Sequence, residues 1–316
     1  MKALVLGATG HIGAHIVRAL LAAGHEVRAG YRSERYLGVL NGLAIDRVRL
    51  DVDTMDGVRQ AMEGCDWIFH AAAYYPKFSD RWAPAMEQAQ RTIRAFIALA
   101  KQARPQRVVL TSSASTLVPL PSDSSGWRPL YAAVKTAIEQ EMQHAVAEGL
   151  PAVIVNPTIC IGEYDSHPFS GLLVLAYAKR WLPVYVDSTI NAIYTGDVGV
   201  AHVRAAQQGR LGIPYLLICQ SVSLKEFAGW VAEAAHLPPP RWRIPYPVAL
   251  AAGAASEAWF RAQGREPVLS WASVQAAVRR TVLDGSRVAE ELGLSLTPLQ
   301  EAVRRAVAWF KAHGYC

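Results

Sequence analysis

The first half of the chain alternates between two hydrophobic patterns. Short runs of aliphatic and β-branched residues have the length of buried parallel strands. Between them, apolar residues recur every three or four positions, as in helices that pack on one side. We expect strands at residues 3–6, 26–30, 46–50, 66–70, 107–111 and 152–155, and helices at residues 12–23, 55–62, 84–102 and 130–148.

This repetition of strand and helix predicts an α/β fold with an open, doubly wound, Rossmann-type parallel sheet. After Asn156 the pattern loosens, and residues 157–190 mix proline, glycine and aromatic residues, as a loop-rich pocket wall would. A helix at 198–208 and a strand at 215–219 are expected to return the chain to the main sheet.

The last third of the chain predicts a smaller second region. The stretch LPPPRWRIPY cannot continue a helix, because proline lacks the amide donor, and it predicts a connection. The remainder, including 288–292 and 299–313, is expected to be mostly helical. We therefore predict a dinucleotide-binding domain of residues 1–156 plus roughly 190–220, and a discontinuous substrate-binding region of residues 157–189 and 221–316.

Composition and charge narrow the class of protein. With 52% apolar and 18% charged residues in 316, the chain has the make-up of a globular protein rather than a disordered one. The net charge of +6 comes mostly from scattered arginines, which ordinarily form a basic surface without specific meaning. The alternative is affinity for an anion, such as a phosphorylated cofactor or an acidic membrane. No nucleic-acid partner is expected, since no basic stripe or binding motif accompanies the charge.

Cysteine spacing and hydropathy indicate the compartment. The four cysteines lie far apart with no CxxC or CxxH spacing, so neither a disulfide framework nor a metal site is expected. No signal-peptide pattern opens the chain, and no run approaches the ~20 apolar residues of a membrane-spanning helix. We expect a cytoplasmic protein, with peripheral membrane contact left open.

The first predicted strand ends in a glycine-rich turn, GATGHIG at residues 7–13, that leads directly into a helix. Three glycines permit a tight turn, a close approach to a pyrophosphate and close packing of the helix on the strand. The free amides and positive dipole end of the helix favour phosphate. The cofactor-binding residues expected here are Gly7, Thr9, Gly10, His11, Ile12 and Gly13.

The second strand ends without the acidic residue that usually holds the adenosine ribose of NAD. Arg32 and Ser33 stand there instead and suit a 2′-phosphate, which favours NADP, with NAD possible. At the close of the third strand, Asp51 and Val52 stand where an adenine contact is expected. Alternatively, Asp51 caps the following helix.

Small and hydroxyl-bearing residues follow the next two strands. Alanines after the fourth strand leave room for a cofactor to lie flat, whereas His70 is interpreted as a structural residue. The fifth strand delivers Ser112 and Ser113 to the carboxyl edge of the sheet, where open α/β sheets bind ligands. The cofactor contacts expected at these two strand ends are Ala71, Ala72, Ala73 and Thr111.

Tyr131 and Lys135 lie four residues apart in a predicted helix and therefore share one face. The pair alone would mean little. However, the glycine turn, the small strand end, the serine cluster and this helix follow one another in order, each at the end of its own element. The combination predicts that the tyrosine and lysine form a proton-transfer device.

These motifs resemble the extended short-chain dehydrogenase/reductase family over nearly the whole chain. Within it, the chain looks most like the dihydroflavonol reductase-like branch, particularly the bacterial group named hopanoid-associated sugar epimerases. The matched pieces are GATGHIG at 7–13, TSS at 111–113, YAAVK at 131–135, NPTICIG at 156–162, YVDSTINAIYTGDVGVAH at 185–202 and SRVAEELGLSLTPLQEAV at 286–303.

The resemblance implies an NAD(P)-dependent enzyme in which Tyr131 is the general acid or base. Lys135 would hold the nicotinamide ribose and depress the pKa of the Tyr131 phenol. Ser113 would hydrogen-bond the reacting oxygen and stabilise its developing charge. The nicotinamide end would be lined by Asn156, Pro157 and Thr158.

Three positions depart from the family pattern. Ala89 stands where an asparagine usually takes part in a proton relay. Asn191 stands where sugar-nucleotide epimerases often carry an arginine that clamps the diphosphate, which weakens an epimerase interpretation. Glu163 replaces the proline of the usual Gly-Pro pair and is expected to reshape the pocket.

The favoured function is an NADP-dependent oxidoreductase of a bulky hydrophobic ketone or secondary alcohol, such as a terpenoid, steroid or flavonoid. Two alternatives stay open: an NAD(P)-dependent sugar or sugar-nucleotide epimerase or dehydratase, and a non-catalytic dinucleotide-binding regulator. The resemblance also implies a homodimer paired through the helices at 84–102 and 130–148. The hydrophobic substrate is suggested by the aromatic pocket candidates Tyr74, Tyr75, Phe78, Trp82, Trp127, Phe169 and Tyr177.

Overall fold

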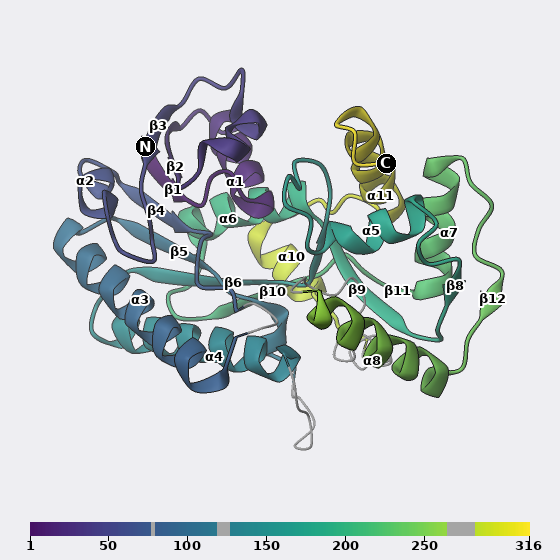
Figure 1. The fold of residues 1–316 in the computed structure, drawn as a ribbon. Helices are drawn as coiled ribbons and strands as arrows, with labels where there is room; N and C mark the ends of the chain where they lie inside the picture. The colour runs from purple at the N-terminus through teal and green to yellow at the C-terminus, as the bar shows by residue number, and fades with distance from the viewer. Residues whose placement is uncertain (77–79, 119–126, 264–281) are drawn as a thin grey trace.

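Seven short strands, most of them buried, pair in parallel at the centre of the molecule (Figure 1). The structure is a computed structural model that describes residues 1–76, 80–118, 127–263 and 282–316. The order β10-β6-β5-β4-β1-β2-β3 confirms the predicted doubly wound sheet. Its strands are β1 (Lys2–Leu6), β2 (Glu26–Tyr31), β3 (Asp46–Arg49), β4 (Trp67–His70), β5 (Arg107–Thr111), β6 (Ala152–Pro157) and β10 (Pro214–Leu217).

Helices cover both faces of this sheet. On one face α1 (His11–Ala22) packs against α6 (Thr195–Gln208), and on the other α3 (Trp82–Ala103) and α4 (Trp127–Ala147) lie side by side (Figure 1). Successive strand residues point to opposite faces, so the sheet separates two apolar cores. A short helix, α2 (Val58–Met62), packs beside α3.

The helix predicted at 55–62 begins three residues later than expected. Met55 and Gly57 have φ values of 66° and 71°, in the left-handed region, so the helical backbone starts only at Val58. Gly57 is the N-cap and provides no side-chain cap. Asp51 does not cap this helix, because its Oδ1 accepts a hydrogen bond from the amide of Asp53 at 2.8 Å.

The C-terminal half returns to the main sheet through α6 and β10, as predicted. Residues 157–190 hold more regular structure than the loop-rich wall expected from their composition. They contain α5 (Gly171–Ala178), whose sequence GLLVLAYA is apolar on every side and therefore shows no one-sided period. The other elements in or entering this stretch are β7 (Ile159–Ile161), β8 (Val184–Tyr185) and β9 (Thr189–Tyr194).

Two small sheets and a helical layer complete the described part of the chain. β9 pairs in parallel with β7 and antiparallel with β11 (Gln220–Ser223), while β8 pairs with β12 (Trp242–Arg243), which interrupts the predicted connection. None of the helices within the described ranges is long and apolar enough to cross a lipid bilayer. The remaining elements are the 3-10 helices η1 (Glu34–Leu40) and η2 (Ala114–Thr116) and the helices α7 (Leu224–Ala235), α8 (Tyr246–Ala262), α10 (Ser286–Leu292) and α11 (Leu299–Ala312).

Candidate active site

The glycine turn after β1 forms a cradle made of backbone. Gly7 has a φ of 79°, and its carbonyl oxygen accepts a hydrogen bond from the amide of Gly10 at 2.9 Å. A Cβ added at Gly13 would lie 2.1 Å from that same oxygen, so the first turn of α1 packs directly on the glycine turn and leaves no room for a side chain at this position. No side chain caps α1, and the first amides of a helix, here those of His11 and Ile12, have no intrahelical partner. This cradle fits a pyrophosphate.

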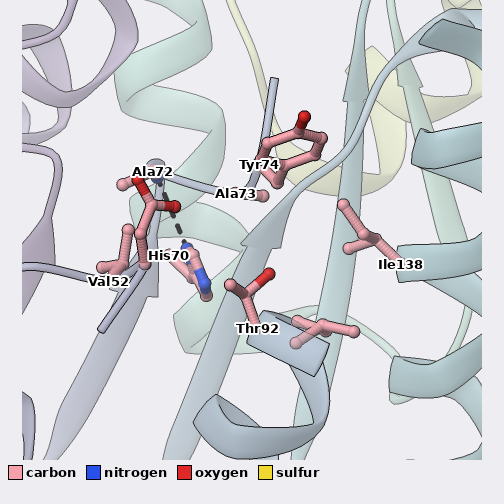
Figure 2. A pocket seen from close by; sticks show the side chains of 9 residues that line it. Val52, His70, Ala72, Ala73, Tyr74, Thr92 and Ile138 are labelled. Carbon is pink, nitrogen blue, oxygen red and sulfur yellow. Dashed lines mark hydrogen bonds between the residues drawn. The ribbon is translucent and has the colours of Figure 1, made fainter. Parts of the chain in front are cut away.

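A small pocket lies next to the cradle, where the ends of β3 and β4 face α3 and α4 (Figure 2). Val52 and Asp53 line it from the segment after β3, and Ala72 and Ala73 line it from the segment after β4. The pocket therefore joins two of the segments predicted to hold the cofactor. Thr92 enters it from α3.

His70, at the end of β4, lines this pocket, and its imidazole is neutral. Its Nδ1 accepts a hydrogen bond from the Ala72 amide at 3.4 Å, drawn in Figure 2, and its ring lies 4.4 Å from the ring of Phe96. Burial lowers the pKa of His70 to about 3, and the charge of Lys135 acts in the same direction. These contacts support the interpretation of His70 as structural.

The residues after β2 meet the segment after β3. The Arg32 guanidinium, 67% exposed, donates to Asp53 Oδ2 at 2.8 Å. Ser33 caps η1, its Oγ accepting from the Arg35 amide at 3.3 Å. Asp53 was not among the predicted site residues, because nothing in the sequence indicates which acid faces Arg32 across the strand ends.

Ser113, Tyr131 and Lys135 lie together at the end of β5 and the first turns of α4. Tyr131 is hydrogen-bonded to Ser113, and Lys135 Nζ lies 5.8 Å from the centroid of the Tyr131 ring. Ser113 Oγ also accepts from the amide and the hydroxyl of Ser115, at 3.2 and 3.0 Å. The structure thus brings the three predicted catalytic residues into one group.

Burial is the main influence on the electrostatics of this group. Burial raises the pKa of Tyr131 to about 12, although the hydrogen bond with Ser113 opposes the shift. Burial also lowers the pKa of Lys135 to about 8. Burial of the phenol is the largest cause of this shift, and the predicted depression of the Tyr131 pKa by Lys135 stays a prediction.

Two aromatic rings stand beside the tyrosine. The Tyr75 ring lies 5.0 Å from the Tyr131 ring and 4.9 Å from the Phe169 ring, and Tyr75 and Phe169 are 39% and 49% exposed. Among the other aromatic candidates, Tyr74 donates to Asp80, Tyr177 is buried and Trp82 is exposed at the start of α3. Phe78 and the side chain of Trp127 lie outside what the structure describes.

A buried group that we call the serine-side cluster lies beneath Ser113. It consists of Ser112, Thr116, Glu139 and Asn156, joined by hydrogen bonds of 2.6 to 2.9 Å to Glu139 Oε2. Glu139 was not predicted, although a signal was present: it follows Lys135 by four residues and so shares its helix face.

Other predicted cofactor residues direct their side chains into the protein. The Thr111 hydroxyl is hydrogen-bonded to His202 Nε2 at 2.9 Å, in the α6 layer, and the Thr158 hydroxyl donates to the Leu217 carbonyl at 2.9 Å. Pro157 is buried in β6. Contacts from these positions to a cofactor would therefore come from the backbone.

A second buried polar group, the histidine-side cluster, surrounds the start of α1. It comprises His11, His15, Glu163 and Asp165. His11 Nδ1 lies 3.7 Å from Asp165 Oδ2, and His15 Nε2 is hydrogen-bonded to the Glu163 carbonyl at 3.1 Å. Burial lowers the pKa of both histidines to about 3 and raises the pKa of Asp165 to about 6. Glu163 Oε1 accepts from the Tyr194 hydroxyl at 3.2 Å, so this departure from the family pattern joins its loop to β9.

The other two departures have different surroundings. Ala89 is fully buried in α3, and Thr92, one turn later, is the hydroxyl that α3 presents to the pocket. The Thr92 hydroxyl donates to the Gln88 carbonyl at 2.9 Å. Asn191 lies on β9, where its Oδ1 accepts from Ser221 Oγ at 2.6 Å.

The chain is similar to several known proteins. A sequence model described as NAD(P)H-binding matches residues 7–166. The chain is 32% identical to a putative dihydroflavonol 4-reductase of Synechocystis sp., over 98% of this chain and 95% of that protein. It is 30% identical to sterol demethylase protein B of Methylococcus capsulatus, over 99% of both. A solved nucleoside-diphosphate-sugar epimerase from Pseudomonas aeruginosa is 27% identical with a TM-score of 0.77, covering 100% of this chain and 99% of the other.

Proposed function

This chain belongs to the extended short-chain dehydrogenase/reductase family, and on that premise we propose that it is an NADP-dependent oxidoreductase of a bulky hydrophobic ketone or secondary alcohol. As a family member it is an NAD(P)-dependent enzyme with a nicotinamide cofactor. The observation that carries the proposal is the group of Ser113, Tyr131 and Lys135 beside two exposed aromatic rings.

Each polar side chain of this group has a separate task. The nicotinamide, when bound, supplies or accepts the hydride. Tyr131 keeps its proton at neutral pH, because burial raises its pKa to about 12, and in reduction it gives that proton to the carbonyl oxygen. Ser113, which is hydrogen-bonded to the phenol in the structure, would donate its one hydroxyl hydrogen to the same carbonyl oxygen. The Lys135 ammonium stabilises the phenolate that remains, and the alcohol oxidation runs through the same groups in reverse.

The preference for NADP rests on the end of β2. Arg32 is exposed there, and that strand end carries no acid for an adenosine ribose. Its present partner, Asp53, is a carboxylate that a 2′-phosphate would replace as the anion next to the guanidinium. The glycine cradle and the pocket at Val52 and Ala72 would hold the rest of the dinucleotide.

The substrate class is inferred from Tyr75 and Phe169. Both rings are partly exposed and in contact, and Tyr75 contacts the Tyr131 ring, so a substrate at the tyrosine hydroxyl would meet flat apolar surface. Phe169 comes from residues 157–189, which with residues 221–316 we assign to the substrate-binding region. The names of the dihydroflavonol reductase and sterol demethylase relatives agree with a polycyclic substrate.

The test is a cofactor titration coupled to a panel of sterol, terpenoid and dihydroflavonol ketones. We expect NADPH to have a dissociation constant at least about tenfold below that of NADH, as one lost charge-assisted contact implies. We also expect turnover of at least one polycyclic ketone. A clear preference for NADH would overturn the role of Arg32, and turnover confined to nucleotide sugars would overturn the substrate class.

The second candidate is a sugar-nucleotide epimerase or dehydratase, which the likeness to the Pseudomonas epimerase favours. Against it, Asn191 offers a substrate diphosphate no cation and is bonded to Ser221. Dinucleotide that stays bound through purification would favour the epimerase, and freely exchanging dinucleotide the reductase. A non-catalytic regulator is disfavoured, since it would not require Ser113, Tyr131 and Lys135 together. We also propose a homodimer paired through α3 and α4, which light scattering would test.

A further inference from the structure

Glu139 is a buried carboxylate on which three neutral donors converge. It is 6% exposed, and its Oε2 accepts hydrogen bonds from Ser112 Oγ at 2.6 Å, Asn156 Nδ2 at 2.8 Å and Thr116 Oγ1 at 2.9 Å. Burying a carboxylate is costly unless such bonds compensate it. The donors come from the end of β5, from η2 and from β6, so a single oxygen of α4 binds three other segments of the fold.

These donors also hold the backbone of Ser113. The Ser113 carbonyl accepts from Thr116 Oγ1 at 2.9 Å and from Asn156 Nδ2 at 3.2 Å. Ser113 has an extended backbone, with φ −155° and ψ 146°, so consecutive side chains point to opposite sides. Ser112 therefore points to Glu139 while Ser113 points to Tyr131.

The hydrogens in this cluster are shared among more acceptors than they can serve at once. Ser112 and Thr116 each offer one hydroxyl hydrogen, and the Asn156 amide offers two. These four hydrogens serve six short contacts, to Glu139, to the Ser113 carbonyl and to Thr116 Oγ1. Removing the Glu139 carboxylate would leave the Ser112 hydroxyl, in a residue only 4% exposed, without this acceptor.

Glu139 does not act by pairing with the catalytic lysine. Burial alone accounts for the lowered pKa of Lys135, and no ion pair joins Lys135 to a carboxylate among the described residues. Glu139 is instead linked to the Ser113 loop by its hydrogen bonds from Ser112, Thr116 and Asn156.

We propose that Glu139 is a positioning residue that fixes the Ser113 loop to α4, and thereby fixes the Ser113 hydroxyl relative to Tyr131 and Lys135. Its consequence for turnover rests on the proposed function. Tyr131 and Lys135 lie on the first turns of the helix that carries Glu139, whereas Ser113 lies on a different segment. Without the carboxylate, the two halves of the catalytic group would no longer be tied to each other at this point.

The first experiment compares Glu139→Gln and Glu139→Leu with Glu141→Gln. Glu141 lies on the same helix but faces outward to Arg94 at 2.5 Å, which makes it the matched control. We expect kcat to fall about tenfold in Glu139→Gln, which keeps one acceptor oxygen, and more in Glu139→Leu. The dissociation constant for NADPH should change less than about twofold. Wild-type kcat in both Glu139 variants would overturn the proposal.

The second experiment needs no substrate. Backbone hydrogen exchange over residues 112–117 reports the loop directly, since the Ser112 and Thr116 amides are bonded to the Val155 and Ser113 carbonyls at 2.8 and 3.1 Å. We expect exchange at least about tenfold faster in both Glu139 variants and unchanged exchange in Glu141→Gln. If Glu139→Leu does not fold, Glu139→Gln and Ser112→Ala carry the test.

The two readouts separate failure of this proposal from failure of the proposed function. Faster loop exchange in an enzyme that turns over no ketone would retain the positioning role and reject the reaction. Unchanged exchange together with unchanged kcat in an active ketone reductase would reject the positioning role alone. Ser112→Ala is expected to raise the exchange rate less than Glu139→Leu, because it removes one donor of three.

Discussion

The serine-side and histidine-side clusters both bury polar groups beside the expected cofactor site, but they satisfy them differently. Glu139 is surrounded by neutral donors at 2.6 to 2.9 Å. Both clusters hold buried polar atoms without a hydrogen-bond partner among the described residues, Asn156 Oδ1 on the serine side and His11 Nε2 and Glu163 Oε2 on the histidine side, but His11 and Asp165 meet only at 3.7 Å. The serine-side cluster is therefore suited to fixing positions, and the histidine-side cluster to making stability depend on pH.

The largest effect that we expect is a loss of folding stability at acidic pH, which tests the buried histidines. Burial lowers the pKa of His11, His15 and His70 to about 3 and that of His202 to about 4, so the folded protein keeps them neutral. Their stabilising contribution is complete above pH 6.5 and is lost as pH falls, since the unfolded chain takes up protons first. Below pH 6.5, the contribution of each histidine to the free energy of unfolding falls by about 1.4 kcal/mol per pH unit.

Two carboxyl groups oppose this trend. Burial raises the pKa of Asp165 to about 6 and also raises the pKa of Asp197, which favours the folded state as pH falls, but these are two groups against the four histidines. Urea unfolding at pH 7.5 and pH 5 measures the balance. We expect a stability lower by several kcal/mol at pH 5. Equal stabilities would contradict the neutral, buried state of these histidines.

The next effect concerns the charge beside Tyr131. Lys135→Met should reduce kcat at least about 100-fold with the fold retained, because the phenolate loses its neighbouring cation. Since burial lowers the pKa of Lys135 to about 8, wild-type turnover should decline as pH rises through about 8, and the variant should lack this limb. Lys179→Met is the control: this exposed ammonium lies 4.9 Å from the Trp181 ring. If turnover of Lys135→Met still declined as pH rises through about 8, the decline would have to come from the titration of another group.

A smaller effect is expected at the end of β2, outside both clusters. Arg32→Ala should raise the KM for NADPH about tenfold, or about 1.4 kcal/mol, and leave the KM for NADH unchanged. Arg35→Ala is the matched control, since its guanidinium stacks on Tyr36 at 5.5 Å instead of facing Asp53. Equal changes for both cofactors would show that Arg32 contributes only to general electrostatic attraction.

The smallest effect should come from Asp165→Asn. The asparagine keeps an acceptor for the Gly171 amide, now 3.1 Å from Asp165 Oδ2, and removes a charge that burial disfavours. We expect turnover within about twofold of wild type and stability at pH 7.5 changed by less than about 1 kcal/mol. A fall in kcat as large as that expected for Glu139→Leu would show that the two clusters do not differ in their effect on turnover.

Sequence patterns predicted the main sheet well because most of its strands are short buried runs that alternate with helices. They failed where the backbone departs from one-sided periods, as at α5, which is apolar on every side, and at Met55, whose positive φ delays α2. The spacing of four residues within a predicted helix was enough to predict that Tyr131 and Lys135 share one helix face.

The remaining parts of the site depend on contacts between distant segments. Asp53 meets Arg32 only because β2 and β3 are neighbours, and the donors to Glu139 come from two strands and a 3-10 helix. The sign of the Tyr131 pKa shift depends on burial, which a helix-face argument does not supply. Such features require the tertiary structure.

The most direct test of the account is turnover by Tyr131→Phe, on whichever ketone the wild type reduces fastest, beside Tyr194→Phe. Tyr194 is the matched phenol, which lies next to the histidine-side cluster and is bonded to Glu163 and Arg305 at 3.2 and 3.1 Å. We predict that Tyr131→Phe loses at least about 1000-fold in kcat while binding NADPH normally, and that Tyr194→Phe loses only about 1 kcal/mol of stability. Wild-type turnover in Tyr131→Phe would contradict the account.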